Sequence, residues 1–157
     1  MGSNRGDSMT VLKAALASLE LLSTRPVRVS SFYLTKPIDC PVGSPDFINA
    51  VAEISVASNR TPEELLTRLK EIEIALGRQP KTILNEARTL DLDLITFGSE
   101  VRKSNELILP HPRAHQRAFV LAPLAELNPE LILMGQETSV ICLWEEFPDR
   151  DSVRIIV

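Results

Sequence analysis

The spacing of hydrophobic residues predicts one helix and two strands in the first part of the chain. A helix is expected from Asp7 or Ser8, either of which can cap it, to about Leu22, with an apolar stripe formed by Val11, Leu12, Ala15, Leu16, Leu19 and Leu22. Residues 26–34 and 47–57 predict strands. Alternation in the second strand places Ile48, Ala50, Ala52, Ile54 and Val56 on one face and Phe47, Asn49, Val51, Glu53 and Ser55 on the other.

The next helix has the clearest boundaries in the sequence. Thr61 is in the N-cap position, Pro62 is the first helical residue, and Glu64 completes a capping box. The helix is expected to run to about Leu76 and to end at Gly77. After a polar loop, a strand is predicted within residues 87–98. A helical segment that Pro123 breaks or kinks follows, then a short helix in 138–147 and a final strand in 152–157.

The order of these elements predicts the fold class. It indicates an α/β (α+β) chain with a ferredoxin-like split βαββαβ sheet, helices on both faces, and a single domain over residues 1–157. The strand that should precede the first helix is missing, and in this fold that strand is central. There are three alternatives: the true start lies further upstream, another segment fills the vacant central position, or the fold is impaired. The best candidate to fill the position and hide its unpaired backbone groups is residues 152–157. Alternatively, residues 152–157 add an edge strand.

Composition excludes several classes of protein. The chain has 157 residues, 44% of them hydrophobic, and a net charge of -4, which is typical of a soluble protein and opposes a strongly basic nucleic-acid surface. No apolar run reaches membrane-spanning length, and no signal peptide precedes the first helix. We therefore expect a cytoplasmic protein with no membrane partner. Cys40 and Cys142 are far apart in the sequence and are expected to be reduced and buried.

Two carboxylates interrupt the apolar strand predicted within residues 87–98. Asp91 and Asp93 are flanked by Leu90, Leu92 and Leu94. Because residues i and i+2 of a strand point to the same face, about 7 Å apart at Cα, the two carboxylates are expected side by side. Such a pair suits Mg²⁺, which takes one or two carboxylates and fills its other positions with water and phosphate oxygens. In the alternative, both are salt-bridged or solvated residues at a strand end.

Cationic side chains precede and follow this pair in the sequence. Upstream are Arg78, Lys81 and Arg88, and downstream are His111, Arg113, His115 and Arg117. Metal-bound polyphosphate needs both kinds of group, because the metal bridges the phosphates while guanidinium groups bind their free oxygens. In the alternative, the His/Arg segment is a solvated loop and helix start. The sequence has neither a Walker P-loop nor a G-x-G-x-x-G motif.

Two longer motifs carry a resemblance to a known family. The segments ARTLDLDLI and LPHPRAHQRAFVLAPL resemble those of the 6-hydroxymethyl-7,8-dihydropterin pyrophosphokinases of the folate pathway, and the likeness extends to GSNRGD, SSFYLTKPI, DFINAV and ALGR. The resemblance implies a ferredoxin-like fold and transfer of diphosphate from ATP to the pterin hydroxymethyl group, leaving AMP. It also implies two Mg²⁺ ions, with ATP and hydroxymethyldihydropterin as the small-molecule partners.

The resemblance also implies roles for individual residues. Asp91 and Asp93 match magnesium ligands. The implied ATP site consists of Arg78, Lys81, Arg88, His111, Arg113, His115 and Arg117, among which Arg88, His111 and Arg117 are the implied catalytic residues. The implied pterin site consists of two aromatic residues on either side of the ring and three pocket residues, Phe47, Phe119, Thr35, Ile38 and Asn49. Without the resemblance, Phe47 and Phe119 are interpreted as core residues.

The loop before the aspartates departs from the family pattern. Pro80 and Leu84 stand where basic residues are common, Asn85 stands at an aromatic position, and Glu86-Ala87 replaces Gly-Pro. Loss of charge there weakens phosphate contacts. The alternative function is therefore a non-catalytic or weakly active homologue that binds a nucleotide or a protein partner. A ferredoxin-like nucleic-acid-binding module is a third hypothesis, which the acidic net charge opposes.

Overall fold

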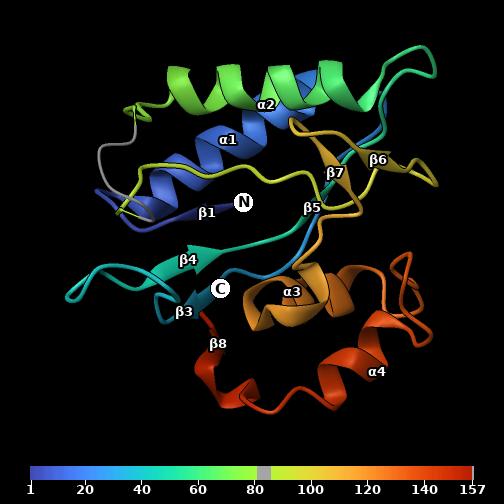
Figure 1. Cartoon of the computed structure of the whole chain (residues 1–157). Helices are drawn as coiled ribbons and strands as arrows, with labels where there is room; N and C mark the ends of the chain where they lie inside the picture. The colour runs from blue at the N-terminus through green and yellow to red at the C-terminus, as the bar shows by residue number, and fades with distance from the viewer. Residues whose placement is uncertain (81–85, 157) are drawn as a thin grey trace.

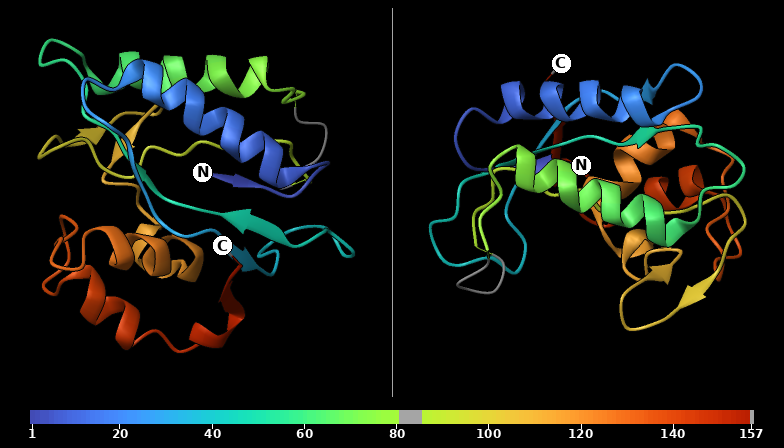
Figure 2. Two further views of the ribbon diagram at one scale, coloured as in Figure 1. Left: turned by 180° about the vertical axis from the view of Figure 1, so that it is seen from behind. Right: turned by 90° about the horizontal axis from the view of Figure 1, so that it is seen from above.

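The protein has an antiparallel sheet between two layers of helices (Figure 1). The computed structural model describes residues 1–80 and 86–156. Helices α1 (Ser8–Leu22) and α2 (Pro62–Ala75) lie side by side on one face, as the view from above also shows (Figure 2). Helices α3 (Ala118–Leu127) and α4 (Val140–Glu145) lie on the other face. This mixed α/β arrangement confirms the predicted fold class.

The main sheet has the strand order β1-β4-β3-β8. Its strands are β1 (Gly2–Ser3), β4 (Phe47–Asn49), β3 (Tyr33–Thr35) and β8 (Val153–Ile155). Gly2 also forms an antiparallel bridge to Asp91, so β1 lies between β4 and the aspartate segment. β8 pairs with the far side of β3. The idea that residues 152–157 fill the central position is therefore wrong, and the edge-strand alternative is confirmed.

The first residues of the chain hold the two sides of the sheet together. Met1 exchanges backbone hydrogen bonds with Ala50 at 2.9 and 3.0 Å, and Gly2 exchanges them with Asp91 at 2.9 and 2.8 Å. Residues 1–3 thus occupy part of the central position predicted to be vacant. A largely apolar groove of about 680 Å³ lies next to Met1, between residues 51–56 and 92–100. In the described part of the chain, no strand pairs with both of these segments.

Two predicted strands are each divided in the structure. Residues 26–34 give β2 (Arg28–Val29) and the start of β3, while residues 47–57 give β4 and β5 (Ala52–Glu53). Arg28 lies opposite Glu53, and Tyr33 lies opposite Asn49. Between these two pairs, the segment 28–33 therefore contains one more residue than the segment 49–53. This extra residue is the cause of the division. The predicted alternation holds, since Ala50 faces the α1/α2 core and Val51 faces the α3/α4 core.

The helix boundaries follow the capping signals. Asp7 caps α1 by accepting the Thr10 N–H at 3.2 Å, and the capping box of α2 is formed by Thr61 and Glu64 as predicted. Of the predicted break or kink at Pro123, the break is wrong, because α3 continues through this residue. Pro123 is fully buried, and packing offsets the loss of one backbone hydrogen bond. A hairpin of β6 (Arg102–Lys103) and β7 (Ile108–Leu109) was not predicted.

Each layer of helices has its own hydrophobic core. Leu90 and Leu92 pack with α1 and α2, while Ile95 packs with α3 and α4. Leu90 and Leu92 therefore fix the segment that carries the two aspartates.

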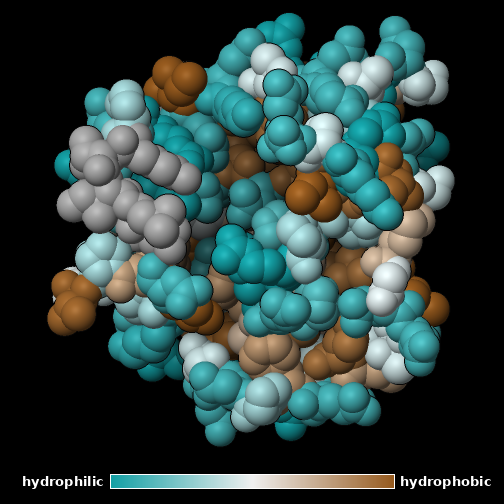
Figure 3. All heavy atoms as spheres, in the orientation of Figure 1, coloured by the Kyte–Doolittle hydropathy of each residue, from teal (hydrophilic) through white to brown (hydrophobic). Residues whose placement is uncertain are grey.

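Both cysteines are free, as predicted, but Cys142 is exposed and Cys40 is only half-buried. None of the helices among the described residues is long and apolar enough to cross a membrane. The face seen in Figure 3 is mostly hydrophilic, with hydrophobic atoms in its recesses.

Candidate active site

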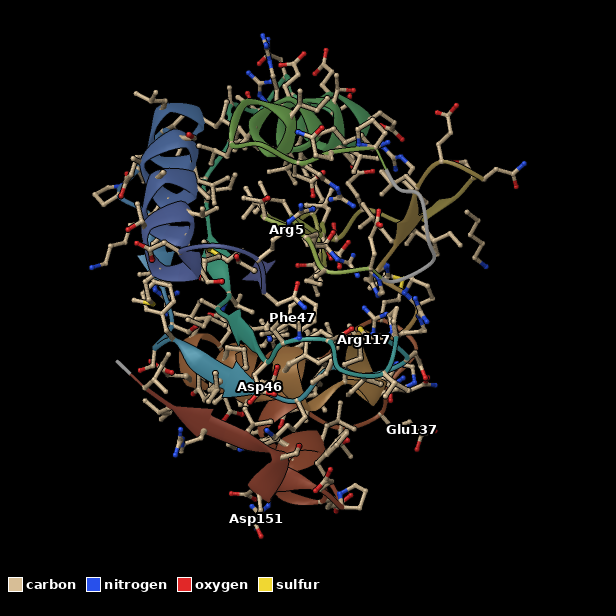
Figure 4. All side chains as sticks on the ribbon, turned by 90° about the vertical axis from the view of Figure 1, so that its left-hand side faces the viewer. Arg5, Asp46, Phe47, Arg117, Glu137 and Asp151 are labelled. Carbon is tan, nitrogen blue, oxygen red and sulfur yellow. The ribbon has the colours of Figure 1, made fainter. Side chains whose placement is uncertain are left out.

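A cavity of about 350 Å³ lies between the two helical layers. Its walls include twelve of the residues predicted as site residues: Thr35, Ile38, Phe47, Asn49, Arg78, Arg88, Asp91, Asp93, His111, Arg113, Arg117 and Phe119. Figure 4 shows Phe47 and Arg117 near each other between the layers, whereas Glu137 and Asp151 lie at the periphery. His115 does not line the cavity and lies beside Gln116. Lys81 lies outside the described residues.

Arg88 is positioned by the N-terminal motif GSNRGD. The backbone N–H of Arg88 donates to Asn4 Oδ1 at 2.9 Å, and the backbone N–H of Asn4 donates to the Arg88 carbonyl at 3.2 Å. Asn4 Nδ2 also donates to the Pro45 carbonyl at 3.1 Å. Asn4 is buried, so these bonds are protected from water. The motif therefore connects three segments at the wall of the cavity.

Asp91 is the centre of a network of ion pairs. Arg78 Nη1 binds Asp91 Oδ1 at 2.9 Å, and Arg88 Nη1 binds Asp91 Oδ2 at 3.0 Å. Arg78 Nη1 also forms an ion pair with Glu73. The Arg88 Nε group is buried and has no hydrogen-bond partner among the described residues. An unsatisfied buried cationic donor is costly, and an anion bound in the cavity would satisfy it.

Asp93 has a different environment although it lies only two residues away. It is exposed at the cavity wall and makes no hydrogen bond or ion pair within the described ranges. Its negative charge still acts on the cavity, because it raises the pKa values of His111 and Arg117. Burial and neighbouring arginines act in the opposite direction and lower both pKa values overall. Asp93 is therefore the carboxylate of the pair that is open to a cation from the cavity.

Residues 111–117 place two arginines and a half-buried histidine at the cavity wall. Burial lowers the pKa of His111, and the cations of Arg117 and Arg113 lower it further. The pKa of Arg117 is lowered first by burial and then by Arg113. The Arg113 backbone N–H donates to His111 Nδ1 at 3.2 Å, which leaves the ring proton on Nε2. Crowded cations that depress one another's pKa create a favourable place for a polyanion.

The other end of the cavity combines aromatic rings with a buried amide. Asn49 Nδ2 donates to Thr35 Oγ1 at 2.7 Å, and both residues are buried. The Arg88 guanidinium lies 5.9 Å from the centre of the Phe47 ring, and that of Arg117 lies 5.4 Å from the centre of the Phe119 ring. This end suits a flat heterocycle whose edge donates and accepts hydrogen bonds.

The donor set fits a divalent cation that is shared with phosphate. Among the described residues, no group of three or more His, Cys, Asp and Glu side chains could hold a metal ion. Asp91 and Asp93 nevertheless line one cavity, and Mg²⁺ requires only one or two carboxylates when phosphate oxygens complete its shell. Binding at Asp91 would break its ion pairs with Arg78 and Arg88, while Arg78 would keep its ion pair with Glu73.

Sequence reasoning missed Glu73. This residue lines the cavity, is only 6% exposed, and accepts the Leu92 backbone N–H on Oε1 at 2.6 Å. The desolvation caused by burial raises its pKa, although Arg78 and the Leu92 N–H act in the opposite direction. A signal was present in the sequence, because Glu73 follows Leu65 and Leu69 at a spacing of four on the buried face of α2. A carboxylate in such a stripe indicates a specific buried partner.

Comparison with known proteins assigns the chain to a family. The model of the family "7,8-dihydro-6-hydroxymethylpterin-pyrophosphokinase (HPPK)" matches residues 1–129. The chain belongs to the HPPK family.

Curated relatives support this assignment over most of the chain. The 2-amino-4-hydroxy-6-hydroxymethyldihydropteridine pyrophosphokinase of Haemophilus influenzae is 36% identical over 156 residues, which cover 99% of this chain and 94% of that protein. The Pseudomonas aeruginosa protein of the same name is 40% identical over 134 residues, covering 85% of this chain and 80% of that one. The Bacillus subtilis protein of this name is 41% identical over 128 residues, covering 81% and 74%. The resemblance drawn from the sequence motifs is therefore confirmed.

Proposed function

We propose that this HPPK-family chain transfers diphosphate from ATP to 6-hydroxymethyl-7,8-dihydropterin in a Mg²⁺-dependent reaction of folate biosynthesis. The pterin hydroxyl oxygen attacks the β-phosphorus of ATP and loses its proton to water, the bond from that phosphorus to the α–β bridging oxygen breaks, and AMP leaves with this oxygen. The observation that carries the proposal is the joint placement of Asp91, Asp93 and four arginines in the cavity that also contains Phe47, Phe119 and Asn49.

The cationic wall of the cavity is assigned to ATP. Arg78, Arg88, Arg113 and Arg117 bind phosphate oxygens, and the unpaired Arg88 Nε supplies one donor. His111 donates from Nε2, because its Nδ1 accepts the Arg113 N–H. A guanidinium held beside the transferring group acts most strongly when charge develops there, so Arg117 and His111 are assigned to the chemical step.

Asp91 and Asp93 are assigned to Mg²⁺. When bound, Mg²⁺ neutralises charge on the attacking and leaving oxygens, and the family resemblance implies two such ions. The role of the chain is to present two carboxylates on a segment fixed by Leu90 and Leu92 in the core. Asp93 is open to the cavity, while Asp91 exchanges its arginine partners for the cation.

The aromatic end of the cavity is assigned to the pterin. Phe47 and Phe119 contact the faces of the ring, Asn49 and Thr35 bind its polar edge, and Ile38 closes the pocket.

Residues 130–157 lie beyond the family match, but α4 packs on α3 and β8 pairs with β3, which supports one domain over residues 1–157. The net charge of -4 opposes a nucleic-acid partner, and the biosynthetic family supports a cytoplasmic location.

An assay of AMP production tests the proposal. Purified chain is incubated with ATP, 6-hydroxymethyl-7,8-dihydropterin and Mg²⁺, and AMP and pterin diphosphate are quantified with and without EDTA. We expect equal amounts of both products, and none in EDTA. Arg117→Ala should lower kcat by about a hundredfold with a smaller change in ATP affinity, while exposed Arg25→Ala serves as the control. ATP binding without any AMP would instead favour the non-catalytic homologue.

A further inference from the structure

Glu73 is the first of four ion-paired side chains, two acidic and two cationic, at the wall of the cavity. It lies in the last turn of α2, and its Oε1 accepts both the Leu92 N–H and Arg78 Nη1. Arg78 in turn binds Asp91, and Asp91 binds Arg88. Along the series Glu73–Arg78–Asp91–Arg88 the side chains alternate in charge, and their four formal charges sum to zero. No other carboxylate in the described part of the chain forms an ion pair with Arg78 besides Asp91.

We propose that Glu73 is a positioning residue for the metal-phosphate site, because it retains Arg78 when a divalent cation takes over Asp91. This inference rests on the proposed function. In this arrangement Glu73 partly neutralises Arg78, so the arginine competes less strongly with the cation for the Asp91 oxygen. Without the Glu73 charge, both arginines would depend on Asp91 alone, and the group would carry a net charge of +1.

The backbone contact gives Glu73 a second way to position the aspartates. The Leu92 N–H lies between Asp91 and Asp93 in the chain, and Glu73 holds it at 2.6 Å. On the opposite edge of the same segment, Asp91 is held by its two hydrogen bonds to Gly2. The segment is therefore fixed on one edge by backbone pairing and on the other edge by a single buried side chain. Its position relative to α2 is set by that side chain together with the packing of Leu90 and Leu92 against the helix.

The variant Glu73→Gln tests the role of the negative charge apart from that of the hydrogen bonds to Leu92 and Arg78. The amide oxygen of glutamine can still accept from Leu92 and Arg78, but the negative charge is lost. Glu71→Gln is the matched control, since Glu71 is on the same helix and forms an exposed ion pair with Arg68 at 2.7 Å. Calorimetry with α,β-methylene-ATP, a non-transferable analogue, measures binding at a series of Mg²⁺ concentrations and in EDTA. Thermal unfolding of each variant is recorded in parallel.

We expect Glu73→Gln to raise the Mg²⁺ concentration for half-maximal analogue binding by about tenfold, the range found for groups that orient metal ligands. Binding of the metal-free analogue in EDTA should be unchanged or tighter, because the cavity has become more positive. Glu71→Gln should behave as the wild type. A general structural defect would weaken both kinds of binding together, so this opposite response identifies a positioning role.

Two results would overturn the inference while leaving the proposed function intact. The first is a wild-type Mg²⁺ dependence in Glu73→Gln. The second is a parallel loss of metal-dependent and metal-free binding together with a lower unfolding temperature, which would mean that Glu73 only supports the fold. If the wild-type chain itself binds the analogue identically with Mg²⁺ and in EDTA, the proposed function fails at its metal requirement and this inference fails with it.

Discussion

At the scale of single residues, the two aspartates differ more than their spacing suggests. Asp91 accepts Arg78 and Arg88 on its two oxygens, and these three side chains are 16–24% exposed. Asp93 is exposed and has no partner among the described residues. Removing either charge would relieve the repulsion between the two carboxylates, which by itself is stabilising. At Asp91 this gain is outweighed, because the substitution also removes the ion pairs with Arg78 and Arg88.

Asp91→Asn and Asp93→Asn should both reduce turnover, by about a hundredfold or more, but they should differ in stability. Asp91→Asn leaves two cations without a full counter-charge, so we expect a loss of about 1–3 kcal/mol in the free energy of unfolding. Asp93→Asn should change it by less than about 0.5 kcal/mol, because no contact is lost. Urea unfolding without Mg²⁺, together with the AMP assay, measures both effects.

Asp151→Asn, which alters an exposed carboxylate far from the cavity, is the control for this pair. Equal stability of the Asp91 and Asp93 variants would show that the Asp91 ion pairs contribute nothing. Wild-type turnover in either variant at saturating Mg²⁺ would refute the metal assignment.

His111 makes the stability of the fold depend on pH. Its folded pKa lies below the ordinary value of 6.5, mainly because it is buried and also because Arg117 and Arg113 are near. The unfolded chain therefore binds more protons at this position as the pH falls. The corresponding stability is present above about pH 6.5 and is lost as the pH falls from there through the folded pKa.

His111→Gln removes this titration, so we expect the variant to lose less stability than the wild type when the pH falls from about 7.5 to about 5.5. Urea unfolding at these two pH values measures the difference. An identical loss in both proteins would contradict the assignment, because the histidine would then titrate alike in the folded and unfolded states.

At the scale of elements, β8 is the strand whose role was left open by its sequence. It is short and rich in β-branched residues, so it is suited to any sheet position. The structure places it at the edge beyond β3, where Tyr33 pairs with Ile155 and the Ile155 side chain remains 58% exposed. Its loss would expose the edge of β3 but would not open the core.

Deletion of residues 152–157 should therefore leave the chain folded, with a loss of about 1–3 kcal/mol in the free energy of unfolding. Circular dichroism and urea unfolding measure this, and light scattering reports association through the newly exposed edge of β3. An unfolded or wholly insoluble product would contradict the edge position of β8. AMP production should persist, because none of the described residues 152–156 lines the cavity.

Other elements show which patterns predict structure well. The helices α1 and α2 follow from their apolar stripes and caps, because these signals act within one turn of the chain. The strand predicted within residues 87–98 is realised as a single bridge at Asp91. A strand needs a partner at the correct distance, and the sequence of a segment does not specify which segment will lie beside it.

At the scale of the whole molecule, the site is assembled from segments that are far apart in the sequence. Asn49 and Phe47 come from β4, Arg78 follows α2, Asp91 pairs with β1, and Arg117 is the N-cap residue of α3. The cavity lies between the two helical layers, so the residues proposed to bind phosphate and the pterin ring converge only when both layers pack on the sheet. Disruption of either hydrophobic core should therefore affect the site as well as the stability.

The sequence by itself determined the fold class, the alternation of Ile48–Val56 and twelve of the residues that line the cavity. Local periodicity, capping and motif spacing are properties of contiguous residues, and family motifs carry the site residues with them. Only the tertiary structure decided that β1 occupies part of the central position, that β8 is an edge strand, that His115 lies away from the cavity, and that Glu73 lies within it. Each of these depends on which distant segments come into contact, and that is set by packing of the whole chain.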